Sequence, residues 1–256
     1  MDAEFAPWRK RHEFESVSVG KLKVFRAVIS GVETNVLITG IGPSHAETST
    51  TVYFIMQSGR NEEMDACISA GLVGVLRPGH SIGKPLTAKS IQRGSVDNRG
   101  TQPELVSSEF LMRLAGDQGA VTVEKFLTVD HIIQTAEEKF KLSRISEGVE
   151  MESYEVFKSA GVWGVPVVAV RSVSDLEGED LPLDLSHAVD TRGQVSSLKV
   201  LMQVAKHPLA IPRFARFARN SRKAALFLAN FLDRYVSALD AHGDHFANVE
   251  KSVSVT

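Results

Sequence analysis

Two carboxylates in this chain stand at the edges of apolar segments, where burial and neighbouring groups could tune them for chemistry. Glu152 lies in the stretch 149–153 (VEMES) and opens a predicted helix. Asp175 closes the stretch 171–175 (RSVSD), which follows the most strand-like run of the sequence, 165–170. Ligands in open α/β sheets bind beyond the carboxyl ends of strands, so we expect Asp175 to face a ligand. The spacing of the two stretches fits a helix that leads into the next strand of a βαβ unit.

The bulk composition is that of an ordinary globular protein. The chain has 256 residues, of which 43% are hydrophobic and 23% charged, and this is enough for one large α/β domain. The net charge of −2 gives no reason to expect binding to nucleic acid. The eight histidines are scattered without the spacing of metal ligands, so we expect no metal site.

The cysteine content and the lengths of the apolar runs indicate a protein of the cytoplasm. The one cysteine, Cys67, excludes an internal disulfide and suits a reducing compartment. Because Cys67 lies in the apolar run 66–68, we interpret it as a packed core thiol rather than a nucleophile. No apolar stretch of about 18 residues is present, and the polar residues 1–4 do not resemble a signal peptide.

Strands alternate with helices along the chain, which predicts a single α/β domain over residues 1–240. The expected strands cover 21–29, 34–39, 64–70, part of 77–91, 121–129 and 165–170. The expected helices cover 44–57, 104–115, 134–143, 154–163 and the region that ends at 239. A glycine turn is expected over 71–74, and the polar tail 241–256 is expected to be frayed.

A glycine loop precedes the first expected helix. Gly40 and Gly42 let the backbone approach a ligand closely, and the helix start that follows favours an anion. Two glycines at this spacing also form simple tight turns, so both interpretations stay open.

The two carboxylate stretches, their separation and their expected elements resemble those of the purine nucleoside phosphorylase and nucleosidase superfamily. The most similar branches are the methylthioadenosine/S-adenosylhomocysteine nucleosidases and the hopanoid-associated nucleoside phosphorylases. The resemblance covers residues 1 to about 239 and is strongest over 130–175. It implies a three-layer α/β/α fold around a central mixed sheet. It also implies an enzyme that breaks the N-glycosidic bond of a purine nucleoside, in our leading interpretation a 5′-substituted adenine nucleoside.

The resemblance assigns roles to both stretches. Met151 would pack on the ribose, Glu152 would bind its hydroxyls, and Asp175, preceded by Ser174, would protonate the purine. An acid at the departing base lowers the barrier, typically by a factor of roughly 10²–10⁴. Asp175 must then carry a proton, which an apolar setting favours, whereas Glu152 must stay ionised. The structural alternative is that Glu152 caps its own helix and Asp175 pairs with Arg171.

The first residues of the chain suggest which group activates the attacking water. The segment 1–4 resembles the nucleosidase segment in which a glutamate activates water, and this makes Glu4 the candidate base. The alternative is an exposed acid at a chain end. The family usually has a strand immediately before this segment, and this chain begins there. We therefore expect either a start further upstream or a sheet that lacks an inner strand.

Several other positions follow from the same resemblance. Gly40 and Gly42 match the glycine loop of the family, and Ile132 and Ile133 would cover the purine unless they are ordinary core residues. Leu72 stands where the family often has a hydroxyl residue. Lys84 replaces its usual acid, and the two changes suggest an altered substrate or weakened activity. The residues that resemble the hopanoid-associated branch more than the nucleosidases are Asp130, Glu138, Lys139, Leu181, Pro182, Pro208 and Pro212.

Three classes of function stay open at this point. Hydrolysis is favoured by Glu4, and phosphorolysis by the likeness to the hopanoid-associated branch. Leu72 and the lack of the family's first strand favour a non-catalytic nucleoside-binding protein. Apart from phosphate as a possible co-substrate, we expect no cofactor. Because members of the family usually form oligomers, the resemblance implies a homo-oligomer, most simply a dimer. The last helix has a basic side that could touch a membrane, but we favour a solvated basic face. Its basic residues are Arg213, Arg216, Arg219, Arg222 and Lys223.

Overall fold

The computed structural model describes residues 2–59, 64–95, 101–182 and 210–241. The helices are α1 (Asp2–Arg9), α2 (Pro43–Ser58), α3 (Glu109–Asp117), α4 (Ala136–Leu142), α5 (Ser153–Val162) and α7 (Ile211–Asp240). The strands are β1 (Glu15–Val19), β2 (Leu22–Ile29), β3 (Val32–Ile38), β4 (Cys67–Val75), β5 (Pro85–Arg93), β6 (Leu105–Val106), β7 (Val121–Thr128), β8 (Gly148–Glu150) and β9 (Val167–Asp175). The predicted tail from 242 onwards and the region 183–209, with Pro208, lie outside the described residues.

Most expected elements are confirmed, and the exceptions have physical reasons. The expected helix over 104–115 begins only at Glu109, where the Ser108 hydroxyl accepts from the Leu111 amide, because the residues before it form the edge strand β6. The expected turn over 71–74 is wrong, since β4 continues through it to Val75. The sequence patterns did not reveal α1, β1 and β8, which are short.

The central sheet is mixed and closes on itself. Its strand order is β6-β5-β7-β8-β4-β9, and β5 also pairs with β9. The pairs β5–β7, β7–β8 and β4–β9 are parallel, whereas β4–β8 and β5–β9 are antiparallel. The additional β5–β9 pairing joins the last strand of the series to the second, so that β5, β7, β8, β4 and β9 form a closed ring. This ring leaves β9 paired on both sides.

Strands β1, β2 and β3 form a separate antiparallel sheet. Within the described residues, no strand connects this sheet to the six-stranded one.

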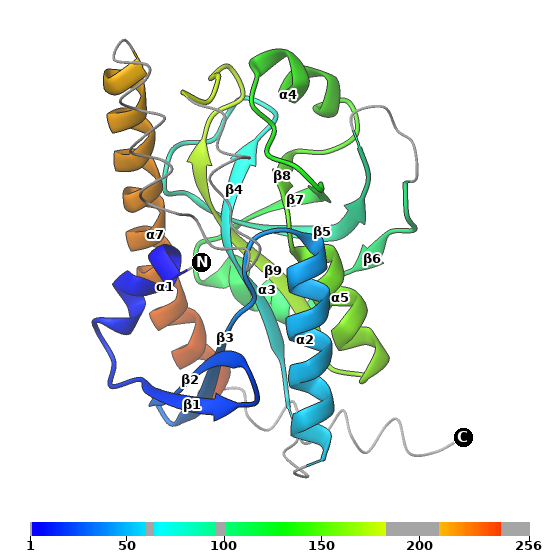
Figure 1. The fold of residues 1–256 in the computed structure, drawn as a ribbon, viewed down its shortest axis with the longest axis vertical. Helices are drawn as coiled ribbons and strands as arrows, with labels where there is room; N and C mark the ends of the chain where they lie inside the picture. The colour runs from blue at the N-terminus through cyan, green and yellow to red at the C-terminus, as the bar shows by residue number, and fades with distance from the viewer. Residues whose placement is uncertain (1, 60–63, 96–100, 183–209, 242–256) are drawn as a thin grey trace.

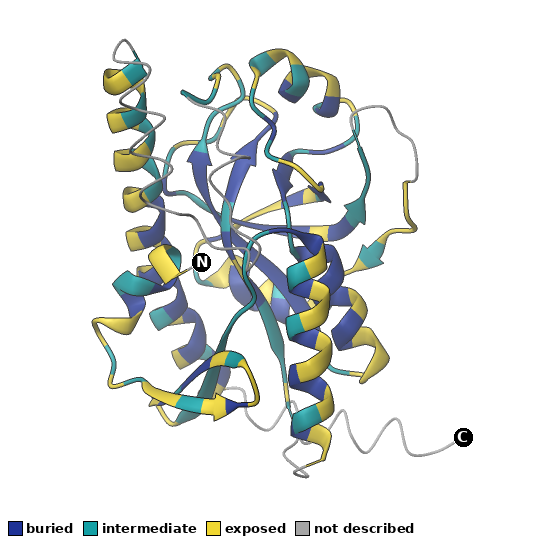
Figure 2. Cartoon of the chain, in the orientation of Figure 1, coloured by how far each residue is buried: buried dark blue, intermediate teal, exposed yellow. Residues whose placement is uncertain are grey.

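Helices cover both faces of the central strands, which confirms the three-layer α/β/α architecture. Helices α2 and α5 lie side by side on one face, and α7 lies on the other with α3 (Figure 1). Strand β9 is buried along almost its whole length (Figure 2). Its alternate residues enter different cores: Val168 and Val170 pack with α7, whereas Val167, Ala169 and Val173 pack with α5.

Helix α7 anchors the N-terminal helix. Asp233 on α7 accepts hydrogen bonds from Trp8 Nε1 at 2.6 Å and Arg11 Nη1 at 2.7 Å, and it also contacts His12. Phe5 joins Trp8 in the core beneath α7. The interaction holds α1 in one place, although α1 has only 8 residues.

The basic residues of α7 lie mostly on its exposed side, whereas its apolar residues Leu228 and Phe231 are buried. The helix therefore carries the solvated basic face that the sequence predicts. Among the helices of the described segments, none is long and apolar enough to cross a membrane.

Candidate active site

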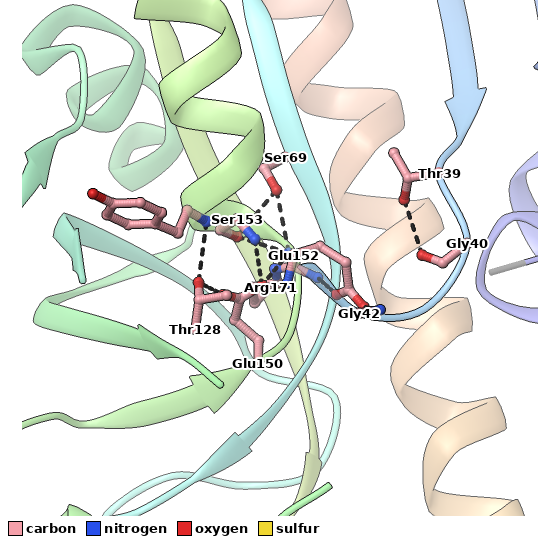
Figure 3. Close-up of polar contacts among 10 residues, drawn as sticks. Thr39, Gly40, Gly42, Ser69, Thr128, Glu150, Glu152, Ser153 and Arg171 are labelled. Atoms are coloured by element: carbon pink, nitrogen blue, oxygen red, sulfur yellow. Dashed lines mark hydrogen bonds and ion pairs between the residues drawn. The ribbon is translucent and has the colours of Figure 1, made fainter. Parts of the chain in front are cut away.

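The N-terminus of α5 is capped by Glu150 rather than by Glu152. Glu150 Oε2 accepts from the backbone amides of Glu152 at 3.0 Å and Ser153 at 2.8 Å (Figure 3). The Thr128 hydroxyl accepts from the Tyr154 amide at 3.0 Å and donates to Glu150 Oε1. The Glu152 side chain makes no capping bond, so the structural alternative for this residue is wrong. Its carboxylate is left available for the site.

Arg171 connects the two glutamates. Its Nη2 lies 2.5 Å from Glu150 Oε2 and also donates to the Ser153 hydroxyl at 2.7 Å and the Ser69 hydroxyl at 3.2 Å. Its Nη1 lies 3.7 Å from Glu152 Oε2. The guanidinium is buried, and its hydrogen bond to Glu150 fixes the direction in which Nη1 points (Figure 3).

Gly71 makes room for this guanidinium. On the parallel strands β4 and β9, Gly71 pairs with Arg171. A Cβ at position 71 would lie only 2.1 Å from Arg171 Nη1. A side chain at position 71 would have to displace the Arg171 guanidinium, so this glycine is explained by packing across a strand pair and not by a turn.

Glu152 reaches across to the glycine loop. Its Oε1 accepts from the Gly42 amide at 3.0 Å, and Gly42 has a φ of 92° that favours glycine. Burial raises the pKa of Glu152 to about 7, helped by Glu150 and Glu4 and opposed by Arg171 and the Gly42 amide. A pKa near neutrality differs from the expectation that Glu152 stays ionised.

Helix α1 brings Glu4 to the same point. Glu4 Oε2 lies 3.7 Å from the position that a Cβ of residue 71 would occupy, and its charge contributes to the raised pKa of Glu152. Glu4 is half-buried, so it is not an exposed acid at a chain end. Glu4, Glu152 and Arg171 thus converge around Gly71, although they come from three distant parts of the fold.

Asp175 is the last residue of β9, as the sequence predicts. Val73 pairs with Val173 but Gly74 pairs with Asp175, so Ser174 is an extra residue that forms a β-bulge. A Cβ at Gly74 would lie 2.7 Å from Asp175 Oδ2, and glycine there admits the carboxylate. The Ser174 hydroxyl lies 2.7 Å from Asp175 Oδ1 and 3.2 Å from the Val73 carbonyl oxygen.

The charged partner of Asp175 is Lys139, on α4. Lys139 Nζ lies 2.5 Å from Asp175 Oδ2 and donates to the Leu176 carbonyl at 2.7 Å. The alternative that Asp175 pairs with Arg171 is therefore wrong. In the sequence, Lys139 stands out only as a point of family resemblance, and nothing in the local pattern signals a contact between residues 36 positions apart.

The remaining predicted site residues are Met151, Ile132, Ile133 and Gly40. Met151 is half-buried, and its Cε lies 3.9 Å from the position that a Cβ of Gly42 would occupy, beside Glu152. Ile133 is only 4% exposed and packs in a core cluster that Met151 also touches, so the ordinary core interpretation fits it. Ile132 is half-buried, and Gly40, with a φ of 89°, belongs to the loop that leads to Gly42.

A small pocket adjoins Asp175 at the carboxyl end of β9. The segment after β9 and the first turns of α7 form its walls. Its lining residues are Asp175, Glu179, Asp180, Leu181, Pro182, Arg213, Arg216, Phe217 and Asn220. The carboxyl end of β9 thus has a concave surface beside its carboxylate, as the position of Asp175 predicts.

Two kinds of chemistry find no support in the described residues. No cluster of three or more His, Cys, Asp or Glu side chains there could hold a metal ion. Burial raises the pKa of the Cys67 thiol to about 12, which makes Cys67 a packed thiol and a poor nucleophile. The charged groups that the structure brings together here are carboxylates, one arginine and one lysine.

Comparison with known proteins gives one family match and a consistent group of similar folds. The profile of the phosphorylase superfamily matches residues 1–206. A 5′-methylthioadenosine/S-adenosylhomocysteine nucleosidase of Buchnera aphidicola subsp. Schizaphis graminum is 23% identical over 175 residues, which are 62% of this chain and 73% of the relative.

Solved structures show the same fold. The 5′-methylthioadenosine/S-adenosylhomocysteine nucleosidase from Neisseria meningitidis, in complex with methylthio-immucillin-A, aligns with a TM-score of 0.69 and 19% identity. The match covers 93% of this chain and 96% of that one. Futalosine hydrolase of Helicobacter pylori strain 26695 aligns with a TM-score of 0.68 and 23% identity, over 93% and 95% of the two chains.

Proposed function

The chain belongs to the phosphorylase superfamily, and from this premise we propose that it cleaves the N-glycosidic bond of a purine nucleoside. We propose a 5′-substituted adenine nucleoside as substrate, with water as the attacking group. The relatives named above include nucleosidases that act on such compounds. The observation that carries the proposal is the convergence of Glu4, Glu152 and Arg171 around Gly71.

The sugar would lie against Glu152 and Met151. An ionised carboxylate can accept hydrogen bonds from two ribose hydroxyls, while the Gly42 amide and Arg171 keep it in place. Because burial raises its pKa to about 7, Glu152 takes up this role as the pH rises through neutrality. Met151 supplies an apolar surface beside it.

The charges around Arg171 favour water over phosphate. Arg171 already pairs with Glu150 at 2.5 Å, and Glu152 and Glu4 add two further carboxylates. This excess of negative charge would repel a phosphate anion, whereas a water molecule could donate to Glu4. Glu4 would then take the proton of the attacking water as general base.

The base would leave toward Asp175. Arg171 and Asp175 are four residues apart on β9, a distance of roughly 13 Å along an extended strand. A ligand that reaches both groups must therefore lie along the β4–β9 pair, with its sugar near Gly71 and its base near Gly74. Asp175 would deliver a proton to the purine as the glycosidic bond breaks.

Phosphorolysis is the second candidate, because α2 begins directly after the glycine loop. The N-terminus of a 16-residue helix is a suitable place for an anion. However, the Gly42 amide already binds Glu152, so phosphate would have to displace this carboxylate.

The proposal is tested by the release of adenine from methylthioadenosine, S-adenosylhomocysteine and adenosine, with and without phosphate. We expect release without phosphate and its loss in Asp175→Asn. Strict dependence on phosphate would make the protein a phosphorylase. No release from any of the three, together with retained binding of the nucleosides, would make it a binding protein.

We also propose that the protein acts as a homodimer in the cytoplasm. The lone thiol of Cys67 suits a reducing compartment. Apolar side chains are exposed on α2, at Val52 and Ile55, and at the end of α5, at Val162 and Trp163. These two helices lie side by side, so the exposed residues could meet a second copy. Sedimentation equilibrium would measure the oligomeric state.

A further inference from the structure

Lys139 is a buried cation with its ammonium group directed at the candidate general acid. Only 1% of its side chain is exposed, against 14% for Asp175. Two of its three N–H donors are used, by Asp175 Oδ2 at 2.5 Å and by the Leu176 carbonyl at 2.7 Å. Asp175 lines the adjoining pocket, whereas Lys139 is not among the residues that line it.

The surrounding structure holds Lys139 firmly. Helix α4 begins with a capping box in which Thr135 and Glu138 satisfy each other's backbone amides. The next amide, that of Ala136, donates to Asp180 Oδ1 at 2.8 Å, and Asp180 belongs to the segment that follows Asp175. The lysine and the carboxylate are thus fixed to each other by two connections, one direct and one through the helix start.

This geometry conflicts with the simple picture of an isolated carboxylic acid. An ammonium group in contact favours the ionised carboxylate, whereas protonation of a departing purine requires a proton on Asp175. The conflict disappears if the two side chains form one unit. A carboxylate paired with an ammonium holds the same number of protons as a carboxylic acid paired with an amine.

We propose that Lys139 is a positioning residue for Asp175 and that the two side chains act as one proton donor to the leaving base. The proposal rests on the function proposed above and deepens it. As the glycosidic bond breaks, its electron pair moves onto the base. A proton leaves Lys139 Nζ and bonds to Asp175 Oδ2. The O–H bond then breaks as the proton binds to a ring nitrogen of the purine. Lys139 remains as a neutral amine until it takes a proton from water after the base has left.

Other charged side chains lie near Lys139 and Asp175, and most of them have hydrogen-bond or ion-pair partners elsewhere. Glu179 pairs with Arg216 at 3.4 Å, and Asp180 accepts from the Ala136 amide. The pKa of Glu138 is lowered by hydrogen bonds from the start of α4, against the effect of burial, so Glu138 stays ionised. Arg213 lines the same pocket from α7. Of these groups, only Lys139 hydrogen-bonds to the Asp175 carboxylate.

The decisive experiment compares the pH dependence of kcat/KM in the wild type, Lys139→Met and Lys139→Arg. Methionine keeps an unbranched apolar stem but removes the charge, so Asp175 must then carry its own proton. We expect the alkaline limb of Lys139→Met to move to lower pH, because the proton is then held by a carboxyl group alone, which releases it at lower pH than an ammonium group does. At a pH above that limb we expect kcat to fall by a factor of roughly 10² or more, with little change in KM.

Two further variants separate the loss of the transferable proton of Lys139 from the loss of its charge and from a general effect of substitution on α4. Lys139→Arg keeps the positive charge, but a guanidinium does not release its proton, so its alkaline limb should move to lower pH as in Lys139→Met. Lys141→Met is the matched control, because Lys141 lies on the same helix but is 54% exposed and pairs with Glu137. This control should have the wild-type profile. Equal profiles for Lys139→Met and the wild type would overturn the proposal, as would a uniform loss of activity at every pH in a folded Lys139→Met.

A second measurement separates this proposal from the proposed function. NMR titration of the Asp175 carboxyl carbon needs no substrate and no turnover. We expect this carboxyl to remain ionised to a lower pH in the wild type than in Lys139→Met. If the wild type cleaves no nucleoside, the proposed function fails while the titration still tests the pair. An identical titration in both proteins would overturn the role of Lys139.

Discussion

Gly71 and Arg171 face each other across the parallel strands β4 and β9, and the guanidinium fills the space where a side chain at residue 71 would begin. A Cβ at that residue would lie 2.1 Å from Arg171 Nη1, closer than real Cβ atoms approach any neighbour. The same guanidinium holds Glu150 and approaches Glu152. The absence of one side chain on β4 therefore decides where the charged groups of the site can lie.

We expect Gly71→Ala to lose activity and to lower the free energy of unfolding by about 3–5 kcal/mol. The added methyl group must displace Arg171 and break its buried ion pair with Glu150, and this is the typical cost of such a break. Urea unfolding measures the change. Gly116→Ala is the matched control, because Gly116 lies within α3 and its added Cβ meets nothing within 4 Å. It should be neutral or more stable by up to about 1 kcal/mol. A Gly71→Ala protein as stable as this control would contradict the packing argument.

The two glutamates of the VEMES stretch should respond to substitution in opposite ways. Glu150→Gln removes the charge that Arg171 binds and weakens the cap of α5, so we expect a loss of about 3–5 kcal/mol in stability. Glu152→Gln removes a charge whose burial is unfavourable, so its stability should equal or exceed that of the wild type while nucleoside binding is lost. Thermal unfolding measures the stability of each variant, and calorimetric titration with a nucleoside measures its binding. The reverse order of stabilities would show that Glu152, not Glu150, is the structural residue.

Glu152 should make the free energy of unfolding depend on pH. Its pKa rises from 4.5 to about 7 on folding, so the folded state keeps a proton that the unfolded state releases. The contribution of Glu152 to the free energy of unfolding must therefore fall as the pH rises from about 4.5 to about 7 and level off above that. The difference between wild type and Glu152→Gln, measured by urea unfolding over this range, isolates the contribution from other groups. A difference that does not change with pH would contradict the raised pKa of Glu152.

Glu4→Gln tests the candidate base. We expect kcat to fall by a factor of roughly 10²–10⁴ while KM for the nucleoside changes little, because the amide cannot take a proton from water. The charge of Glu4 is one cause of the raised pKa of Glu152, so the acid limb of kcat/KM measured on residual activity should move to lower pH. Glu13→Gln is the control, since Glu13 is an acid outside the site, shortly after α1. Full activity in Glu4→Gln would assign the base to another group.

Local patterns in the sequence determined most of the elements and the position of Asp175. The apolar run at 165–170 and the polar residues after it specify a buried strand with a carboxylate at its end, because neighbours along the chain set strand periodicity and burial. The helix after Glu152 is specified in the same way. The three-layer architecture followed from the alternation of such elements together with the family resemblance.

Tertiary structure alone decided which of these residues meet. Glu150 and Glu152 are two positions apart and chemically identical, and only the approach of Arg171 makes one the cap and leaves the other for a ligand. Gly71 and Gly74 were expected to form a turn, whereas they lie within strand β4. The side chains of Arg171 and Asp175, from the neighbouring strand β9, occupy the space beside these glycines. The contact between Lys139 and Asp175 also joins separate elements. Such contacts depend on how the strands close into a ring and how helices pack on them, and the sequence records that information over its whole length rather than in any local stretch.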